Sequence, residues 1–385
     1  MIYNNAVMNL SITAKNACKV TVEVAGGATV DHTYAAGETY EFKSIKVVGA
    51  VTVSTAGSVA NGYDPFNLQS AADVAAAFNG KNEITVNGDY AVPTNVQIPA
   101  GKKMIVNGNI TNANNLTLGS GATVEVAAGK TIAPASTWTI SNGATIKGTV
   151  DTTAAGLTVN GGGVTIDGGV TGASGLTVSA GMVRLTGNVS DVKNVAAGAS
   201  LDVTGSVTTL SNNSGSIKIS GNVDTVAKTT AGTVDIGGKI TTLTANAGTI
   251  KVPALPTTLT DSDGTLVVTG DVDAAANITN ATNVVFEGKV TAKLTVGAAT
   301  VIEFKQTTPV VMATVLPNTS TAGVKAKFAV APTPEGAAAT NPGAFFNYNG
   351  TAGNATHMTT IDIDKTYALT VGCGSSSVNG WMADS

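Results

Sequence analysis

Histidine and cysteine are the first residue types to check for acid–base or metal chemistry, and this chain has two of each. His32 lies towards one end of the chain and His357 towards the other, in segments of different composition. A zinc site needs three or four Cys, His or carboxylate ligands close together, so this distribution predicts no metal site and no bound cofactor. Cys18 and Cys373 are separated just as widely, and the sequence alone does not say whether either forms a disulfide.

Aspartates recur beside glycines along the middle of the chain, where paired carboxylates would suit cleavage of a glycosidic bond. That reaction needs two carboxyl groups that converge in a cleft, and no long insertion is present to wall such a cleft. Asp is also a common turn former, so we expect no catalytic residue and no enzymatic activity; a polysaccharide depolymerase is the less favoured alternative. The aspartates in question are Asp151, Asp167, Asp191, Asp224, Asp271 and Asp273.

The most regular set of charged side chains lies inside a repeat. Apolar–x–apolar triplets recur along the chain, and the middle residues of five successive triplets alternate in sign: Arg184, Asp202, Lys218, Asp235 and Lys251. If triplets stack as neighbouring strands, opposite charges face each other, and each pair contributes about 0.2–1 kcal/mol. We interpret these residues as a structural charge ladder rather than as a ligand-binding surface.

The next two middle positions are apolar, Val267 and Val285. On an isolated chain they would be exposed, and exposed apolar residues in a row often mark a contact with another subunit. We therefore predict a homo-oligomer, with these valines as a possible subunit contact.

The elements that position these residues follow from the repeat. Successive triplets are separated first by 20 residues and then by 16 to 19, and in ten of the thirteen units Gly stands four places after the triplet start. Gly suits a corner there because it accepts a positive φ without steric penalty. A unit this short cannot bury its own apolar face, but stacked units share a continuous core. This predicts an all-β fold built on a single-chain β-solenoid, a right-handed parallel β-helix of about 13 layers and on the order of 60 Å long. The triplets begin at Ile84, Met104, Val124, Ala144, Val164, Val183, Leu201, Ile217, Val234, Ile250, Leu266, Val284 and Ile302.

The chain ends do not follow the repeat and predict separate units. Residues 1–62 read as a small β domain, residues 63–81 as a linker with one short capping helix, residues 82–306 as the solenoid, residues 307–343 as a Pro/Ala-rich linker and residues 344–385 as a small β tip domain. Ser70 and Asp73 form a capping-box pattern at the helix start. The tip concentrates aromatic residues that either form its core or contact sugars or protein: Phe345, Phe346, Tyr348 and Trp381.

Bulk composition excludes several partners. The net charge is −4, which gives no general attraction for nucleic acid. No apolar run has the ~20 residues that a bilayer-spanning helix requires, so we expect no membrane insertion. The first residues lack the basic and apolar regions of a secretory signal, so we expect no export by that route.

The phrase Leu201-Asp-Val-Thr-Gly-Ser-Val resembles the layers of bactofilins, bacterial filament proteins built almost entirely from a solenoid, over residues 84–305 at most. The added end domains resemble instead a bacteriophage virion appendage, such as a head fibre, capsid decoration protein or tail fibre. That resemblance implies a homotrimer located in the virion, attached to a capsid or other virion protein through residues 1–62. It also implies a tip that touches a host surface glycan or protein. The alternative is a bacterial or archaeal cell-surface adhesin or filament protein.

Overall fold

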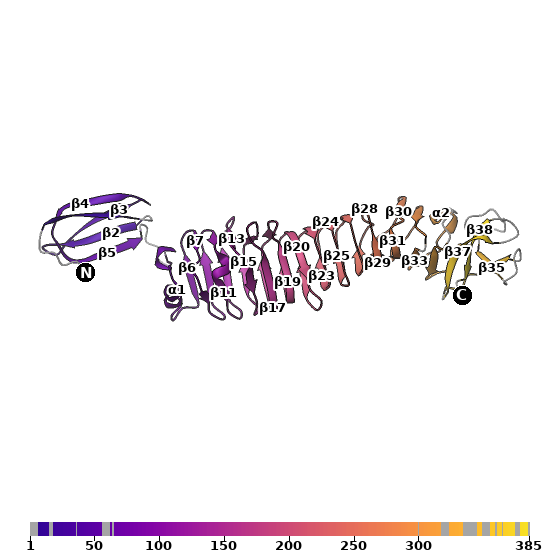
Figure 1. The fold of residues 1–385 in the computed structure, drawn as a ribbon, viewed down its shortest axis with the longest axis horizontal. Coiled ribbons are helices and arrows are strands. Elements are labelled where there is room, and N and C mark those ends of the chain that lie inside the picture. The colour runs from indigo at the N-terminus through magenta and orange to yellow at the C-terminus, as the bar shows by residue number, and fades with distance from the viewer. Residues whose placement is uncertain are drawn as a thin grey trace.

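The computed structural model describes an elongated, almost entirely β protein. It describes residues 7–14, 18–35, 37–55, 62–63, 65–298, 300–316, 323–333, 345–348, 355–358, 360–363, 365–373 and 378–383. Strands account for 53% of the chain and helices for 5%, and the centre is a β-solenoid of about 12 turns. A small β domain lies at one end of this rod and the C-terminal strands lie at the other (Figure 1). The predicted all-β solenoid is therefore confirmed.

The N-terminal domain packs two antiparallel sheets around its own core. Strand β1 (Met8–Thr13) pairs with β4 (Thr39–Ile45). Strand β2 (Cys18–Val24) lies between β3 (Ala28–Tyr34) and β5 (Val47–Thr55). Alternate residues of β2, Val20 and Val22, point inward and pack with Tyr34 and Phe42, as expected for strands with one buried face. None of these side chains belongs to the core of the rod.

One ladder of parallel strands runs along the whole rod, and we call its outer surface the first face. Thirteen strands, from β6 to β33, mark the repeating turns, and β34 adds one more. The sense of winding, predicted as right-handed, stays a prediction. The strands are β6 (Glu83–Val86), β9 (Lys103–Val106), β12 (Thr123–Val126), β15 (Thr145–Lys147), β17 (Leu157–Asp167), β19 (Leu176–Leu185), β21 (Ser200–Val203), β23 (Ser216–Ile219), β25 (Thr233–Ile236), β27 (Thr249–Val252), β29 (Ser262–Val268), β31 (Ala281–Phe286), β33 (Val301–Phe304) and β34 (Lys325–Phe328).

A second ladder forms another side of the rod, and its strands also pair in parallel, turn to turn. It comprises β7 (Tyr90–Ala91), β10 (Ile110–Thr111), β13 (Thr131–Ala133), β16 (Thr149–Asp151), β18 (Val170–Thr171), β20 (Val189–Val195), β22 (Val207–Leu210), β24 (Val223–Val226), β26 (Ile240–Leu243) and β28 (Thr258–Leu259). The third side is less continuous. It comprises β8 (Val96–Ile98), β11 (Leu116–Leu118), β14 (Trp138–Ile140), the first halves of β17 and β19, and the pair β30 (Ala276–Ile278) and β32 (Leu294–Val296).

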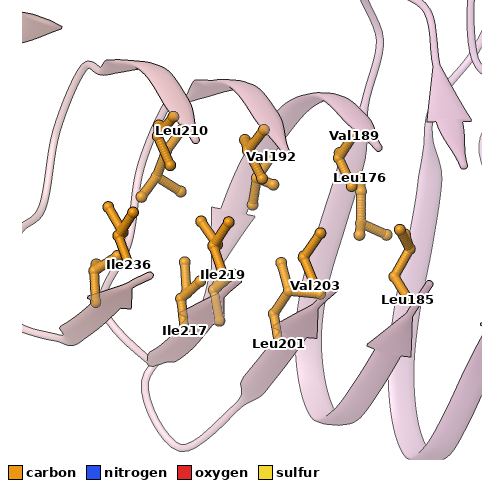
Figure 2. Close-up of a cluster of buried hydrophobic side chains, with 14 of the residues drawn as sticks. Leu176, Leu185, Val189, Val192, Leu201, Val203, Leu210, Ile217, Ile219 and Ile236 are labelled. Carbon is orange, nitrogen blue, oxygen red and sulfur yellow. The ribbon is translucent and has the colours of Figure 1, made fainter. Parts of the chain in front are cut away.

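The core of the rod consists of stacked aliphatic side chains. Leu201 and Ile217 from the first ladder point towards Val192 and Leu210 from the second, and the same arrangement recurs from turn to turn (Figure 2). These side chains are at most 2% exposed. Because β-branched and Leu side chains stack in regular columns on parallel strands, a thin core of such side chains suffices.

Glycine is required at the corners of the rod for a different reason from the one that the sequence repeat suggests. Glycine at a corner is usually explained by a positive φ, but of the ten repeat glycines only Gly88, Gly148 and Gly168 have one. At most of the others a Cβ atom would collide with the corner of the preceding turn. At Gly205, for example, it would lie 2.3 Å from the carbonyl oxygen of Gly187. Close stacking of the turns, more than backbone conformation, therefore requires glycine.

A short helix covers the first turn of the rod, as predicted. Helix α1 (Ala71–Ala77) follows the 3₁₀ turn η1 (Pro65–Asn67). The Ser70 hydroxyl accepts from the Asp73 N–H, which is the N-cap bond of a capping box. The Asp73 carboxylate accepts from the Ser70 hydroxyl, whereas in a full capping box it would accept from the Ser70 backbone N–H. Val74 is fully buried and belongs to the same core as the first strands. Two other short helical turns, η2 (Ala113–Asn115) and α2 (Met312–Val315), were not expected.

The C-terminal strands extend the sheet of the rod, and residues 307–343 are not simply a linker. Strand β34 within that segment pairs in parallel with β33 and antiparallel with β37 (Thr366–Cys373). Strand β38 (Val378–Ala383) then lies between β37 and β35 (Phe345–Tyr348), which pairs with β36 (Ala355–His357). The change from parallel to antiparallel pairing ends the solenoid without leaving the last turn open.

Candidate functional site

The predicted charge ladder occupies consecutive strands of the first face. Arg184 pairs with Asp202, Asp202 with Lys218, Lys218 with Asp235, and Asp235 with Lys251 in the strand register. Their side chains point outward, because the flanking triplet residues are buried. The sequence spacing thus gave the correct register for this part of the rod.

These neighbouring charges do not all form ion pairs. Along the ladder from Arg184 to Asp235, the described residues include no oppositely charged atom within 4 Å of these side chains. Lys251 instead donates to Glu287, at 3.0 Å, two strands further along the face. Long charged side chains on an exposed sheet gain little from pairing with an adjacent strand, which explains why alignment does not produce contact.

Val267 and Val285 follow Lys251 in the same register, but they are half-buried rather than exposed. The Lys251 side chain must pass over β29 to reach Glu287, and its methylene groups therefore lie along the strand that carries Val267. The two valines are thus less exposed than the sequence suggests, and the subunit contact at Val267 and Val285 stays a prediction.

A denser ion network lies at the opposite end of the first face. The Lys103 ammonium group is 3.1 Å from Glu125 and 3.3 Å from Glu83, and Lys147 is 3.8 Å from Glu125. The hydrogen bond to Glu125 raises the pKa of Lys103 against the opposing effect of burial. The sequence spacing misaligns the Glu125–Lys147 part of this network, because the register shifts by two residues there. Val124 pairs with Ile146 and not with the expected triplet start, Ala144.

The scattered aspartates are spread along the rod, mostly in strands or at their ends, rather than gathered in a cleft. Asp151 accepts hydrogen bonds from the N–H and hydroxyl of Thr153. Asp167 accepts from Thr186. Asp224 lies in β24 with an exposed side chain, on the second ladder rather than on the first face.

Three more aspartates complete that set. Asp191 accepts from the Ser211 hydroxyl and forms an ion pair with Lys193 at 2.7 Å. Asp271 and Asp273 border a depression of about 360 Å³ beside the loop that contains Leu255 and Pro256. One Asp271 oxygen already accepts the backbone N–H of Lys289, so it acts as a link between turns.

His32 belongs to an aromatic cluster on the N-terminal domain. Its ring stacks on Tyr40 at a centroid distance of 3.6 Å, and its Nε2 lies 2.9 Å from a Glu38 carboxylate oxygen. The Ala35 backbone N–H, followed by His32, lowers the pKa of Glu38. The pair therefore fixes the turn between β3 and β4 and has no second catalytic group beside it among the described residues. His357 lies in β36, but its side chain is outside the described residues, as is that of Cys373.

The aromatic residues expected at the tip form a core. Phe345 and Trp381 are fully buried and Phe346 is nearly so, so for these three residues the core interpretation holds and the possible tip contact does not. Their rings continue a column that begins inside the rod, where Phe286, Phe304 and Phe328 stack at centroid distances of 5.8 and 5.6 Å. Phe345 then packs against Phe328 and Trp381. The Tyr348 side chain lies outside the described residues.

Neither a metal site nor a membrane-spanning helix is found in the part of the chain that the structure describes. No group of three or more His, Cys, Asp or Glu side chains there is arranged to hold a metal ion. No helix there has the length and apolar composition needed to cross a bilayer.

Comparison with known proteins places the chain in no group. No family model, curated protein or solved structure matches it.

Proposed function

We propose that the chain is a non-enzymatic structural protein of a phage virion, in which the rod is a rigid spacer and the N-terminal domain is the attachment module. The observation that carries this proposal is the division into two cores. One core is continuous from the helix α1 through every turn to Trp381, while the N-terminal domain has a core of its own.

A continuous core with strand hydrogen bonds between all turns resists bending, because each turn contacts its neighbours over its full cross-section. A module with a separate core can bind a particle without disturbing the rod. The elongated arrangement in Figure 1, with this module at one end, suits a spacer. Because Phe345, Phe346 and Trp381 are buried, the proposed function does not include host contact through these side chains.

The covered rod ends support this proposal over a bactofilin-like filament. End-to-end growth needs exposed strand edges at both ends, whereas helix α1 covers the first turn and antiparallel strands cover the last. A cell-surface protein remains the competing setting.

Immunogold electron microscopy of lysates and cells that produce the chain tests the setting. We expect antibodies against the rod to label virus particles, and the label to disappear when the gene is deleted. Label confined to the cell envelope, or to filaments free of particles, would overturn the proposal. A variant that lacks residues 1–62 should leave particles unlabelled while the rod itself is still produced.

A further inference from the structure

The charge ladder is part of a longer column that runs along the entire first face. Fourteen residues, one per strand from β6 to β34, are consecutive partners in the strand register. We call them the outer column and number its positions 1 to 14. They are Glu83, Lys103, Thr123, Thr145, Thr165, Arg184, Asp202, Lys218, Asp235, Lys251, Val267, Val285, Glu303 and Lys327.

The sign of each charged residue in the outer column follows from its position number without exception. Acidic residues stand only at odd positions and basic residues only at even ones, even though neutral residues interrupt the column twice. The acidic positions are 1, 7, 9 and 13, and the basic positions are 2, 6, 8, 10 and 14. Solubility alone would not require acidic residues to stay at odd positions and basic residues at even positions on both sides of the neutral positions 3–5 and 11–12.

In the middle of the outer column, from Arg184 to Asp235, the charged side chains can form ion pairs with another molecule. The side chains from Arg184 to Asp235 form no ion pair within 4 Å among the described residues, whereas Lys103 and Lys251 do. Arg184, Lys218 and Asp235 are exposed, and Asp202 is half-exposed.

Such a column is complementary to itself in one orientation. When two copies face each other antiparallel about a two-fold axis along the strands, position n of one copy faces position 15 − n of the other. Every charge that meets a charge in the outer column then meets the opposite sign. The facing pairs, each occurring twice, are Glu83 with Lys327, Lys103 with Glu303, Arg184 with Asp235, and Asp202 with Lys218.

We propose that the first face is an interface between two antiparallel copies of this chain. Thirteen strand spacings of about 4.8 Å and a width of four residues give about 800 Å² per copy, which is the size of a standard interface. A parallel two-fold pair, or a parallel trimer around this face, would instead place like charges at the same height. In this pairing Val267 faces Thr145 and Val285 faces Thr123. The interface therefore places no two apolar side chains opposite each other at the valines.

Two like-charged contacts oppose this arrangement. On one side of the outer column, Lys81 of one copy faces Lys325 of the other. In the neighbouring column, Glu125 of one copy faces Glu287 of the other, but each is already paired with lysine in its own chain. The antiparallel pair carries an N-terminal domain at both ends, so the assembled unit is a strut between two attachment points rather than a projecting fibre. The pairing itself does not rest on the virion setting.

Zero-length carbodiimide cross-linking of the full chain followed by mass spectrometry tests the orientation. We expect links between Glu83 and Lys327 and between Lys103 and Glu303, residues from opposite ends of the rod that cannot meet within one chain. A dimer that forms only other links between chains, or a chain that sedimentation shows to be monomeric at micromolar concentration and low salt, would overturn the proposal.

Charge exchange tests the complementarity. Asp202→Lys and Lys218→Asp should each raise the dissociation constant by about tenfold, because each places two like-charged contacts near the axis. The two variants mixed together should form a heterodimer of wild-type affinity, since one copy then carries lysine at both positions 7 and 8 and the other carries aspartate at both. An unchanged thermal transition of each variant controls for folding, and failure of the mixture to associate contradicts the proposal.

Discussion

The N-terminal domain and the rod are both made of β-strands, but they bury their side chains in different ways. The domain closes two antiparallel sheets over Tyr34 and Phe42, and its partners are set by long-range pairing such as that of β1 with β4. In the rod most strands pair with the equivalent strand of the next turn, and the core is made mainly of aliphatic columns, with an aromatic column near its C-terminal end. The domain is thus specified by a few large side chains, and the rod by many small repeated ones.

This difference predicts that damage to either core stays local. Phe304→Ala removes the central ring of the aromatic column between Phe286 and Phe328 and should lower the free energy of unfolding of the rod by about 3–5 kcal/mol. Phe42→Ala should lower that of the N-terminal domain by a similar amount. Calorimetry should show two transitions, each shifted by one variant only.

A shared transition that moves with both variants would contradict the separation of the two cores. Because the rod unfolds through contacts between neighbouring turns, Phe304→Ala should also allow the C-terminal strands to exchange their amide hydrogens before the first turns do. Hydrogen exchange of the same samples checks this order.

A smaller loss is expected at the corners of the rod. Gly205→Ala places a methyl group 2.3 Å from the Gly187 carbonyl oxygen, and the turns must separate to admit it. We expect a loss of about 2–3 kcal/mol in the free energy of unfolding of the rod. The matched control is Gly129→Ala, where φ is +75° but nothing lies within 4 Å of the new methyl group. That substitution should cost only about 1 kcal/mol of backbone strain.

Urea denaturation followed by far-ultraviolet circular dichroism measures both changes. Equal losses at Gly205 and Gly129 would show that backbone conformation, and not the close approach of turns, explains the corner glycines.

The sequence predicted the rod well because its determinants are local and repeated. From Val164 onward the triplets are aligned as their spacing indicates. The alignment was wrong between Val124 and Ile146, because an extra two residues in one corner change neither the apolar pattern nor the glycine pattern. The positive φ expected at the corner glycines was mostly wrong as well. The sequence of one turn does not show how closely the preceding turn approaches it.

The ends were harder to predict because their partners are distant in sequence. Lys325–Phe328 has the same alternation as Val301–Phe304, but the intervening residues hide the relation, and β34 was assigned to a linker. The aromatic residues after it were open to two interpretations, and burial against Phe328 decides for a core. Of the candidate site, the register from Arg184 to Lys251 was predictable, but the reach of Lys251 to Glu287 depends on side-chain conformation.

The smallest change in the free energy of unfolding is expected at Tyr90, where the capping helix meets the first turn of the rod. The buried Tyr90 hydroxyl donates to the Leu68 carbonyl, at 3.1 Å. Burial, assisted by the charge of Asp73, raises the pKa of Tyr90 from 10.0 to about 12. A raised pKa means that the folded rod holds this proton more tightly than the unfolded chain does. The stabilisation is complete below pH 10 and is lost as the pH rises from 10 through 12.

Tyr90→Phe deletes the hydroxyl and leaves the ring in place, so we expect a loss of about 1 kcal/mol at neutral pH. The difference in free energy of unfolding between wild type and Tyr90→Phe should then shrink between pH 10 and 12, because only the wild type has this group to titrate. Chemical denaturation at a series of pH values measures that difference, and a constant value would contradict the role given to the hydroxyl. The N-terminal domain, whose core contains neither Tyr90 nor Leu68, should respond identically in both proteins. The comparison between the two cores thereby supplies its own internal control.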